Sequence, residues 1–131
     1  ILSHLTLTKG CIQMKKLIIL AFLLLATVGI ASAKDVDVGT VKNQENANIQ
    51  IYIDDQFIMQ SNNYVFSFAL VDTSTGESER YSGGIASFFG PHDVFYVNGN
   101  PISVNELNAQ TRALFNALLN YVSSHQPSLA Y

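Results

Sequence analysis

Cysteine is almost missing from this chain, because Cys11 is the only one and it lies near the start. The chain after residue 33 has none. It therefore forms no disulfide and offers no thiolate metal site or cysteine nucleophile. A domain of about 100 residues buries roughly 60–65% of its unfolded surface, which is enough for a core held by packing alone.

Basic side chains are also scarce after residue 33. All ten acidic residues remain there, against only four basic ones, which gives a formal net charge of −6; the basic residues are Lys34, Lys42, Arg80 and Arg112. Nucleic acids are bound by clustered Lys and Arg, and anionic membrane surfaces attract the same residues. The composition therefore argues against nucleic acid as a partner and against lasting attachment to an anionic membrane.

The longest apolar run is too short to span a bilayer. Leu17 to Val28 is apolar apart from Thr27, whereas a membrane span needs about 20 residues. Basic Met14-Lys15-Lys16 precedes the run and Ala31-Ser32-Ala33 follows it with a small-x-small cleavage pattern. We predict a cleavable secretory signal peptide, helical, over residues 14–33. The protein is then exported to the periplasm or the medium, and touches the membrane only transiently through that segment.

Residues 1–13 precede a signal peptide that already begins with its own methionine, and they contain none. Lys9-Gly10 is encoded by AAR-GGN, a purine-rich stretch that resembles a ribosome-binding site and lies three codons before Met14. We expect residues 1–13 to be a non-native or untranslated leader. Residues 34–131 then form a single exported domain.

Alternation of apolar and polar residues predicts the first strands. The isoleucines of 49–53 alternate with polar residues, and Asp54-Asp55 is a turn signal, so we expect a hairpin over Ile49 to Gln60. Tyr64 to Val71 is apolar on both faces and is placed in the centre of the sheet. Glu77 to Ser82 is less apolar and returns as its partner, nearer an edge.

Glycine and proline mark the connections that follow. Gly83-Gly84 and Gly90-Pro91 bracket Ile85 to Phe89, which we expect to be an irregular segment that buries Phe88 or Phe89. Asn98-Gly99 predicts a hairpin, because both central residues of its turn need positive φ. Pro101 confines the returning strand to an edge or to its end.

One helix is predicted at the end of the chain. Ser103 and Glu106 form a capping box, apolar residues recur at three- and four-residue steps up to Val122, and Pro127 ends the helix. Strands followed by a single helix predict an α+β fold: a small antiparallel sheet of about 4–6 strands with one C-terminal amphipathic helix packed across one face.

Two groups of residues could carry chemistry. A small hydrolase could use Ser82 or Ser87 as nucleophile with His92 and Asp93, but the G-x-S-x-G pattern is absent and ordinary turns are the preferred explanation of these residues.

Acidic residues could hold a metal, and Asp35-Val36-Asp37-Val38-Gly39 superficially resembles a calcium loop. The further oxygen ligands that such a loop needs are missing, so solvated acidic edges and turns explain it. The other candidate ligands are the carboxylates of Asp54, Asp55, Asp72 and Glu77 and the imidazole of His92. We predict no metal and no cofactor, and an enzyme is not favoured.

A binding role remains as the main hypothesis. The second face of the 64–71 strand is also apolar, so a second chain, a ligand or the Phe88-Phe89 segment should cover it. We predict an exported binding or interaction module whose binding residues are Phe88, Phe89, His92 and Asp93, and whose partner is another envelope protein or the protein itself. The remaining alternative is a subunit of an envelope or surface assembly, with an exposed strand edge at Val36 to Thr40 or Glu77 to Ser82.

Overall fold

The structure is a computed structural model and describes residues 34–131. The predicted leader and signal peptide, with its helix, lie outside the described residues. The elements follow in the order β1 (Asp35–Lys42), β2 (Asn48–Asp54), β3 (Ile58–Gln60), β4 (Asn63–Asp72), β5 (Ser78–Ala86), β6 (Val94–Val97), β7 (Asn100–Ser103), the 3-10 turn η2 (Val104–Glu106), α2 (Ala109–Ser124) and β8 (Leu129–Ala130).

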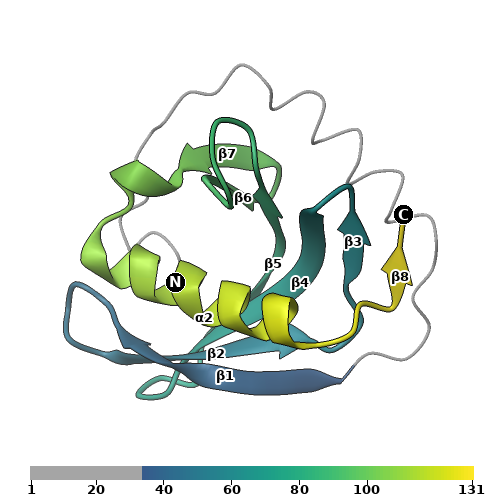
Figure 1. Cartoon of the computed structure of the whole chain (residues 1–131). Helices are drawn as coiled ribbons and strands as arrows, with labels where there is room; N and C mark the ends of the chain where they lie inside the picture. Colours follow the sequence, from purple (N-terminus) through teal and green to yellow (C-terminus); the bar gives the residue numbers. More distant parts are fainter. Residues whose placement is uncertain (1–33) are drawn as a thin grey trace.

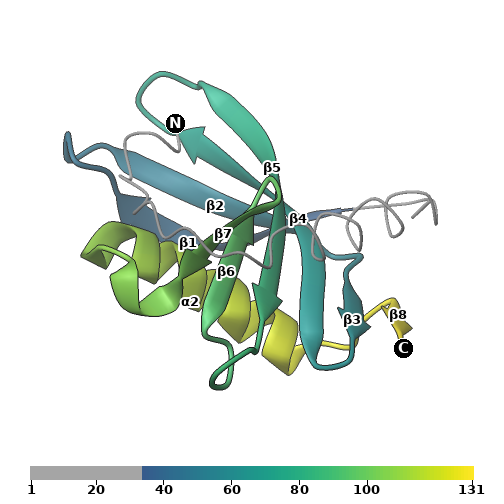
Figure 2. The ribbon, with the colours of Figure 1, turned by 90° about the horizontal axis from the view of Figure 1, so that it is seen from above.

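The strands form one sheet in the order β1-β2-β4-β5-β6-β7, and all of these pairs are antiparallel. The sheet curves around α2, which lies across its inner face (Figures 1 and 2). This confirms the predicted α+β fold with one C-terminal helix. No helix within residues 34–131 has the length and apolar character that crossing a membrane requires.

The core lies between α2 and the inner face of the sheet. Side chains at paired positions share a face, so Ile53, Phe68 and Tyr81 form one inner row across three strands. The helix contributes the residues predicted from its periodicity; those buried are Thr111, Leu114, Phe115, Leu118 and Val122. The strand 64–71 is central, as predicted, because β4 pairs on both sides.

The predicted hairpin over 49–60 is wrong. β2 and β3 do not pair with each other; they follow one another along the same side of β4. Asp54 Oδ1 accepts a hydrogen bond from the Gln56 amide at 2.8 Å, and this local bond bends the chain without reversing it. The reversal comes at Ser61-Asn62, whose φ values of 50° and 69° suit a two-residue hairpin turn.

The irregular segment expected from Gly83 onward is shorter than predicted. Gly83–Ala86 continues β5 and pairs with β6, so the loop begins at Ser87. Among the strands that the structure describes, only β4 pairs with the earlier half of β5, which agrees with the position near an edge predicted for 77–82. Asn98-Gly99 forms the predicted hairpin turn, with φ values of 50° and 81°, and Pro101 lies in β7, the last strand of the sheet path.

The predicted capping box at Ser103 is also wrong. Ser103 precedes only the three-residue η2, and its side chain makes no capping hydrogen bond there. The helix begins at Ala109, and Asn108 Oδ1 caps it by accepting a hydrogen bond from the Thr111 amide at 2.8 Å. The cap therefore satisfies the amide of Thr111 rather than that of Glu106, which the sequence pattern indicated.

The replacement Asn108→Ala should lower the free energy of unfolding by about 1 kcal/mol, because it removes this cap. The matched change Ser103→Ala should stay within about 0.5 kcal/mol of the parent, because its side chain caps nothing. Urea denaturation followed by far-UV circular dichroism measures both. A larger loss for Ser103→Ala than for Asn108→Ala would contradict this assignment of the helix start.

The end of the described chain adds a short parallel strand to β3. β8 pairs Leu129 with Ile58 and Ala130 with Met59. Backbone hydrogen bonds from Ser128 to Phe57 (2.8 Å) and from Tyr131 to Met59 (3.0 Å) hold it. The edge of β3 is thus covered by residues that are far away in the sequence.

Candidate functional site

The loop Ser87–Asp93 between β5 and β6 contains all the residues predicted to bind. The carboxylate of Asp93 organises it by accepting hydrogen bonds from three successive backbone amides, those of Phe88 (2.9 Å), Phe89 (2.9 Å) and Gly90 (3.1 Å). Ser87 Oγ closes the other side by accepting a hydrogen bond from the His92 amide at 2.8 Å. The loop is therefore fixed by its own side chains rather than by regular pairing.

These bonds also set the charge of Asp93. Burial alone would raise the pKa of its carboxyl, but the backbone amides of Phe88, Phe89, Gly90 and Asp93 itself outweigh burial and lower the pKa below its usual value. The carboxylate is thus ionised at neutral pH, which is the form that accepts hydrogen bonds.

Because the folded pKa of Asp93 is lowered, its stabilising contribution is fully present above the unfolded pKa of about 3.9 and is lost as pH falls through the lower folded value. The variant Asp93→Asn should therefore be less stable than the parent at pH 7, and the gap should narrow at acid pH. Urea unfolding at several pH values between about 2 and 7 checks this. A gap of constant size at every pH would contradict it.

Phe88 and Phe89 have opposite surroundings. Phe88 is half-buried and packs against Ala86, Val94 and Tyr96, a small cluster on the outer face of the sheet. Within that cluster, burial raises the pKa of Tyr96 to about 12. Phe89 is 93% exposed. The expectation that one of the two is buried is met in part by Phe88, while Phe89 is left to solvent.

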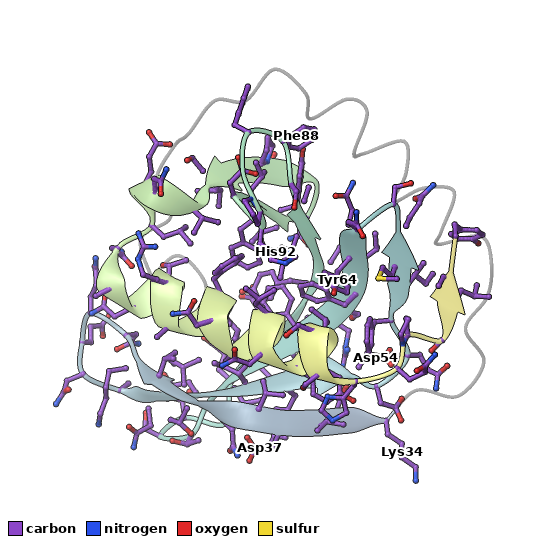
Figure 3. All side chains as sticks on the ribbon, in the orientation of Figure 1. Lys34, Asp37, Asp54, Tyr64, Phe88 and His92 are labelled. Carbon is purple, nitrogen blue, oxygen red and sulfur yellow. The ribbon has the colours of Figure 1, made fainter. Side chains whose placement is uncertain are left out.

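His92 lies on the other side of the loop, beside Tyr64 (Figure 3). Their ring centroids are 6.0 Å apart, and His92 has a φ of 51°. Together with Asn62, Ser87 and Pro91, the two rings line an open hollow of about 430 Å³. His92 Nδ1 is buried without a hydrogen-bond partner, and strained backbone beside a hollow is a common feature of binding sites.

The residues of the hydrolase hypothesis are not arranged for nucleophilic catalysis. Such a mechanism needs an imidazole in contact with the serine oxygen and a carboxylate that orients the imidazole. Ser87 Oγ instead contacts the backbone amide of His92, and Asp93 binds backbone amides while His92 Nδ1 has no partner. Ser82 lies in β5, where its amide donates to Asn98 Oδ1.

The acidic residues are dispersed and locally engaged. Asp37 accepts from Gln50 Nε2 at 2.6 Å, and Asp72 Oδ1 accepts from both the amide and the hydroxyl of Ser74. Within residues 34–131, no three His, Asp or Glu side chains gather as a group that could hold a metal ion.

A second feature, which no sequence motif indicates, lies on the outer face of the sheet. There Arg80 pairs with Asp35 at 2.5 Å and donates to Ser67 Oγ at 3.0 Å. Only strand register brings these residues together, because Asp35 lies 45 positions before Arg80. The alternation of residues in 77–82 could have assigned Arg80 to this face, but only once the strand that pairs with this segment is known.

The apolar residues of this face have limited exposure: Ala69 is buried and Val65 and Val71 are half-buried. Two separate hollows thus lie on the domain, one at the 87–93 loop and one on the outer sheet face.

Comparison of the chain with protein-family models, curated proteins and solved structures finds no match.

Proposed function

We propose that the protein is an exported binding module that holds a protein partner through the loop Ser87–Asp93, with Phe89 as the anchor. The observation that supports this most strongly is that a phenylalanine 93% exposed to solvent lies on a loop fixed by three hydrogen bonds that backbone amides donate to the Asp93 carboxylate. Aromatic side chains supply much of the binding energy of protein interfaces when they enter a pocket of the partner.

The rigidity of the loop strengthens the proposal. Ordering a flexible segment opposes association, whereas a loop already held in one conformation avoids most of that loss of entropy. Phe88 supports the loop from below by packing on Val94 and Tyr96. The partner surface around its apolar pocket should be basic, because the net charge of −6 after residue 33 favours opposite charge.

Photo-crosslinking in the expressing cell tests this directly. A benzophenone amino acid at position 89 should form one discrete protein adduct, whereas the same group at exposed position 74, in the turn after β4, should not. If the adduct contains a second copy of the chain, the partner is the protein itself. Equal adducts at both positions, or none at position 89, would contradict the proposal.

The variant Phe89→Ala should weaken binding of the captured partner by tenfold or more, since it removes an anchor worth about 2 kcal/mol or more. Its stability should stay within about 0.5 kcal/mol of the parent, because the side chain is exposed. Tyr131→Ala is the matched control, since Tyr131 is another exposed aromatic residue, at 63%. Titration calorimetry with the purified partner gives the affinities, and similar values for both variants would refute the anchor.

A subunit of an envelope or surface assembly is the second candidate, because within residues 34–131 no second strand pairs with β5 before Gly83. β6 pairs only from Gly83 onward, and Asn98 covers the transition with two hydrogen bonds to Ser82. An open edge can accept a strand from another molecule, although the charged Glu79 and Arg80 limit such pairing. Oligomers that grow with concentration and persist in Phe89→Ala would favour this candidate in sedimentation experiments.

A further inference from the structure

The hollow on the outer face of the sheet, opposite α2, has the form of a slot. It has a volume of about 280 Å³ and its lining includes Tyr52, Ala69, Val71 and Arg80. Tyr52 pairs with Ala69, and Ala69 pairs with Arg80, so the three side chains form one row across β2, β4 and β5. Because alanine is the smallest of the three, the slot has an apolar floor between an aromatic ring and a guanidinium group.

The polar wall of the slot is held in place before any ligand arrives. Arg80 reaches across β4 and β2 to Asp35 of β1, at 2.5 Å, and also donates to Ser67 Oγ at 3.0 Å. These bonds use two of the five N–H donors of the guanidinium and one of the two oxygens of Asp35. Donors and acceptors therefore stand side by side at the rim.

The charges around the slot restrict the class of ligand. An anion attracted to Arg80 would meet the carboxylate of Asp35. A cation attracted to Asp35 would meet Arg80. A neutral ligand with hydroxyl groups avoids both conflicts, because each hydroxyl can donate to Asp35 and accept from Arg80.

We propose that this slot binds the ring of a neutral sugar. A sugar ring has an apolar C–H face that can pack on Tyr52 and on the floor formed by Ala69 and Val71, and a rim of hydroxyls that meets the Arg80–Asp35 pair. Pockets that enclose drug-sized ligands have volumes of about 300–1,000 Å³. The slot is slightly smaller than this range, so its volume suits a single sugar ring. Since the slot is open to solvent, the affinity is millimolar. This site is separate from the 87–93 loop and does not depend on the function proposed for it.

Titration of the full exported protein followed by ¹H–¹⁵N NMR tests the proposal. The probes are glucose, galactose, mannose and N-acetylglucosamine, each raised to about 100 mM, which detects millimolar affinities. At least one should shift the amides of Tyr52, Ala69 and Arg80 in a saturable way and leave those of the 87–93 loop unmoved. Glucosamine and glucuronate, the charged counterparts of glucose, should bind at least tenfold more weakly than the best neutral sugar.

Two variants and two controls show whether the slot itself binds. Tyr52→Ala, which removes one wall, and Ala69→Val, which fills the floor, should each weaken binding at least tenfold while the remaining spectrum keeps its dispersion. Tyr52→Phe keeps the ring and should bind within threefold of the parent, as should Phe89→Ala, which alters only the loop. No saturable shift with any neutral sugar, tighter binding of glucosamine or glucuronate, or unchanged binding by Ala69→Val would overturn the proposal.

Discussion

Phe68→Ala is expected to lower the free energy of unfolding by about 3–5 kcal/mol, the usual loss for a large aromatic residue removed from a core. Phe68 is fully buried in β4, and its ring lies 5.3 Å from that of Tyr81, 6.1 Å from Phe66 and 6.3 Å from Phe95. Small domains have a total stability of only about 5–15 kcal/mol, so the variant should be close to unfolding.

Urea denaturation followed by circular dichroism measures this loss. Phe68→Leu is the matched control, since it keeps most of the apolar volume and should lose less than about half as much. A loss below about 1 kcal/mol for Phe68→Ala would mean that the inner face of β4 is not the centre of the core.

The second large effect is expected at Gly83 in β5. A Cβ added there would overlap the ring of Phe66, with Cε1 nearest and Cδ1 at 2.8 Å. Phe66 is 5% exposed and has little room to move, so Gly83→Ala should lower the free energy of unfolding by about 1–3 kcal/mol. The strand conformation itself tolerates alanine, and the loss therefore comes from the ring.

Two further variants isolate that cause. Gly90→Ala should stay within about 0.5 kcal/mol of the parent in urea denaturation, because nothing lies within 4 Å of its added Cβ. Phe66→Leu should be less harmful in the Gly83→Ala background than alone, because the smaller side chain relieves the overlap. If the losses of stability caused by Gly83→Ala and Phe66→Leu simply add in the double variant, the ring of Phe66 is not the reason why position 83 requires glycine.

The features predicted correctly are those that depend on neighbours in the sequence. The buried face of α2 follows from its three- and four-residue spacing, the central position of β4 from its two apolar faces, and the turn at Asn98-Gly99 from the positive φ that it requires. Each of these signals lies within one element or one turn.

The errors in the fold come from residues whose roles are set at a distance. Gly83 is predicted to lie in a connection, but it is a strand residue that pairs with Phe66 and Val97, and the ring of Phe66 occupies the space that a side chain at this position would need. Asp54-Asp55 is predicted to reverse the chain, but the pairing of β3 with β4 shows that it forms a bend. Ser103 and Glu106 match the sequence pattern of a capping box, but the residue that caps the helix is Asn108.

The same division holds for the candidate sites. The sequence predicts binding residues in the segment from Phe88 to Asp93. In the structure, Asp93 accepts hydrogen bonds from backbone amides and is not a partner of His92. Arg80 and Asp35 were not predicted to meet, because their contact depends on the register of four strands. Such register is a property of the whole sheet, which no short window of sequence contains.

The order of pairing in the sheet has a consequence for how the chain folds. Apart from the inserted β3, each strand from β1 to β7 pairs with the strand that follows it, so hairpins can close over short loops. The helix that covers the inner face follows β1 to β7 in the sequence and contacts β1, at the opposite end of the described chain. Until α2 docks, the aromatic inner face of the sheet is exposed to water, and it is there that a partly folded chain is most prone to aggregate.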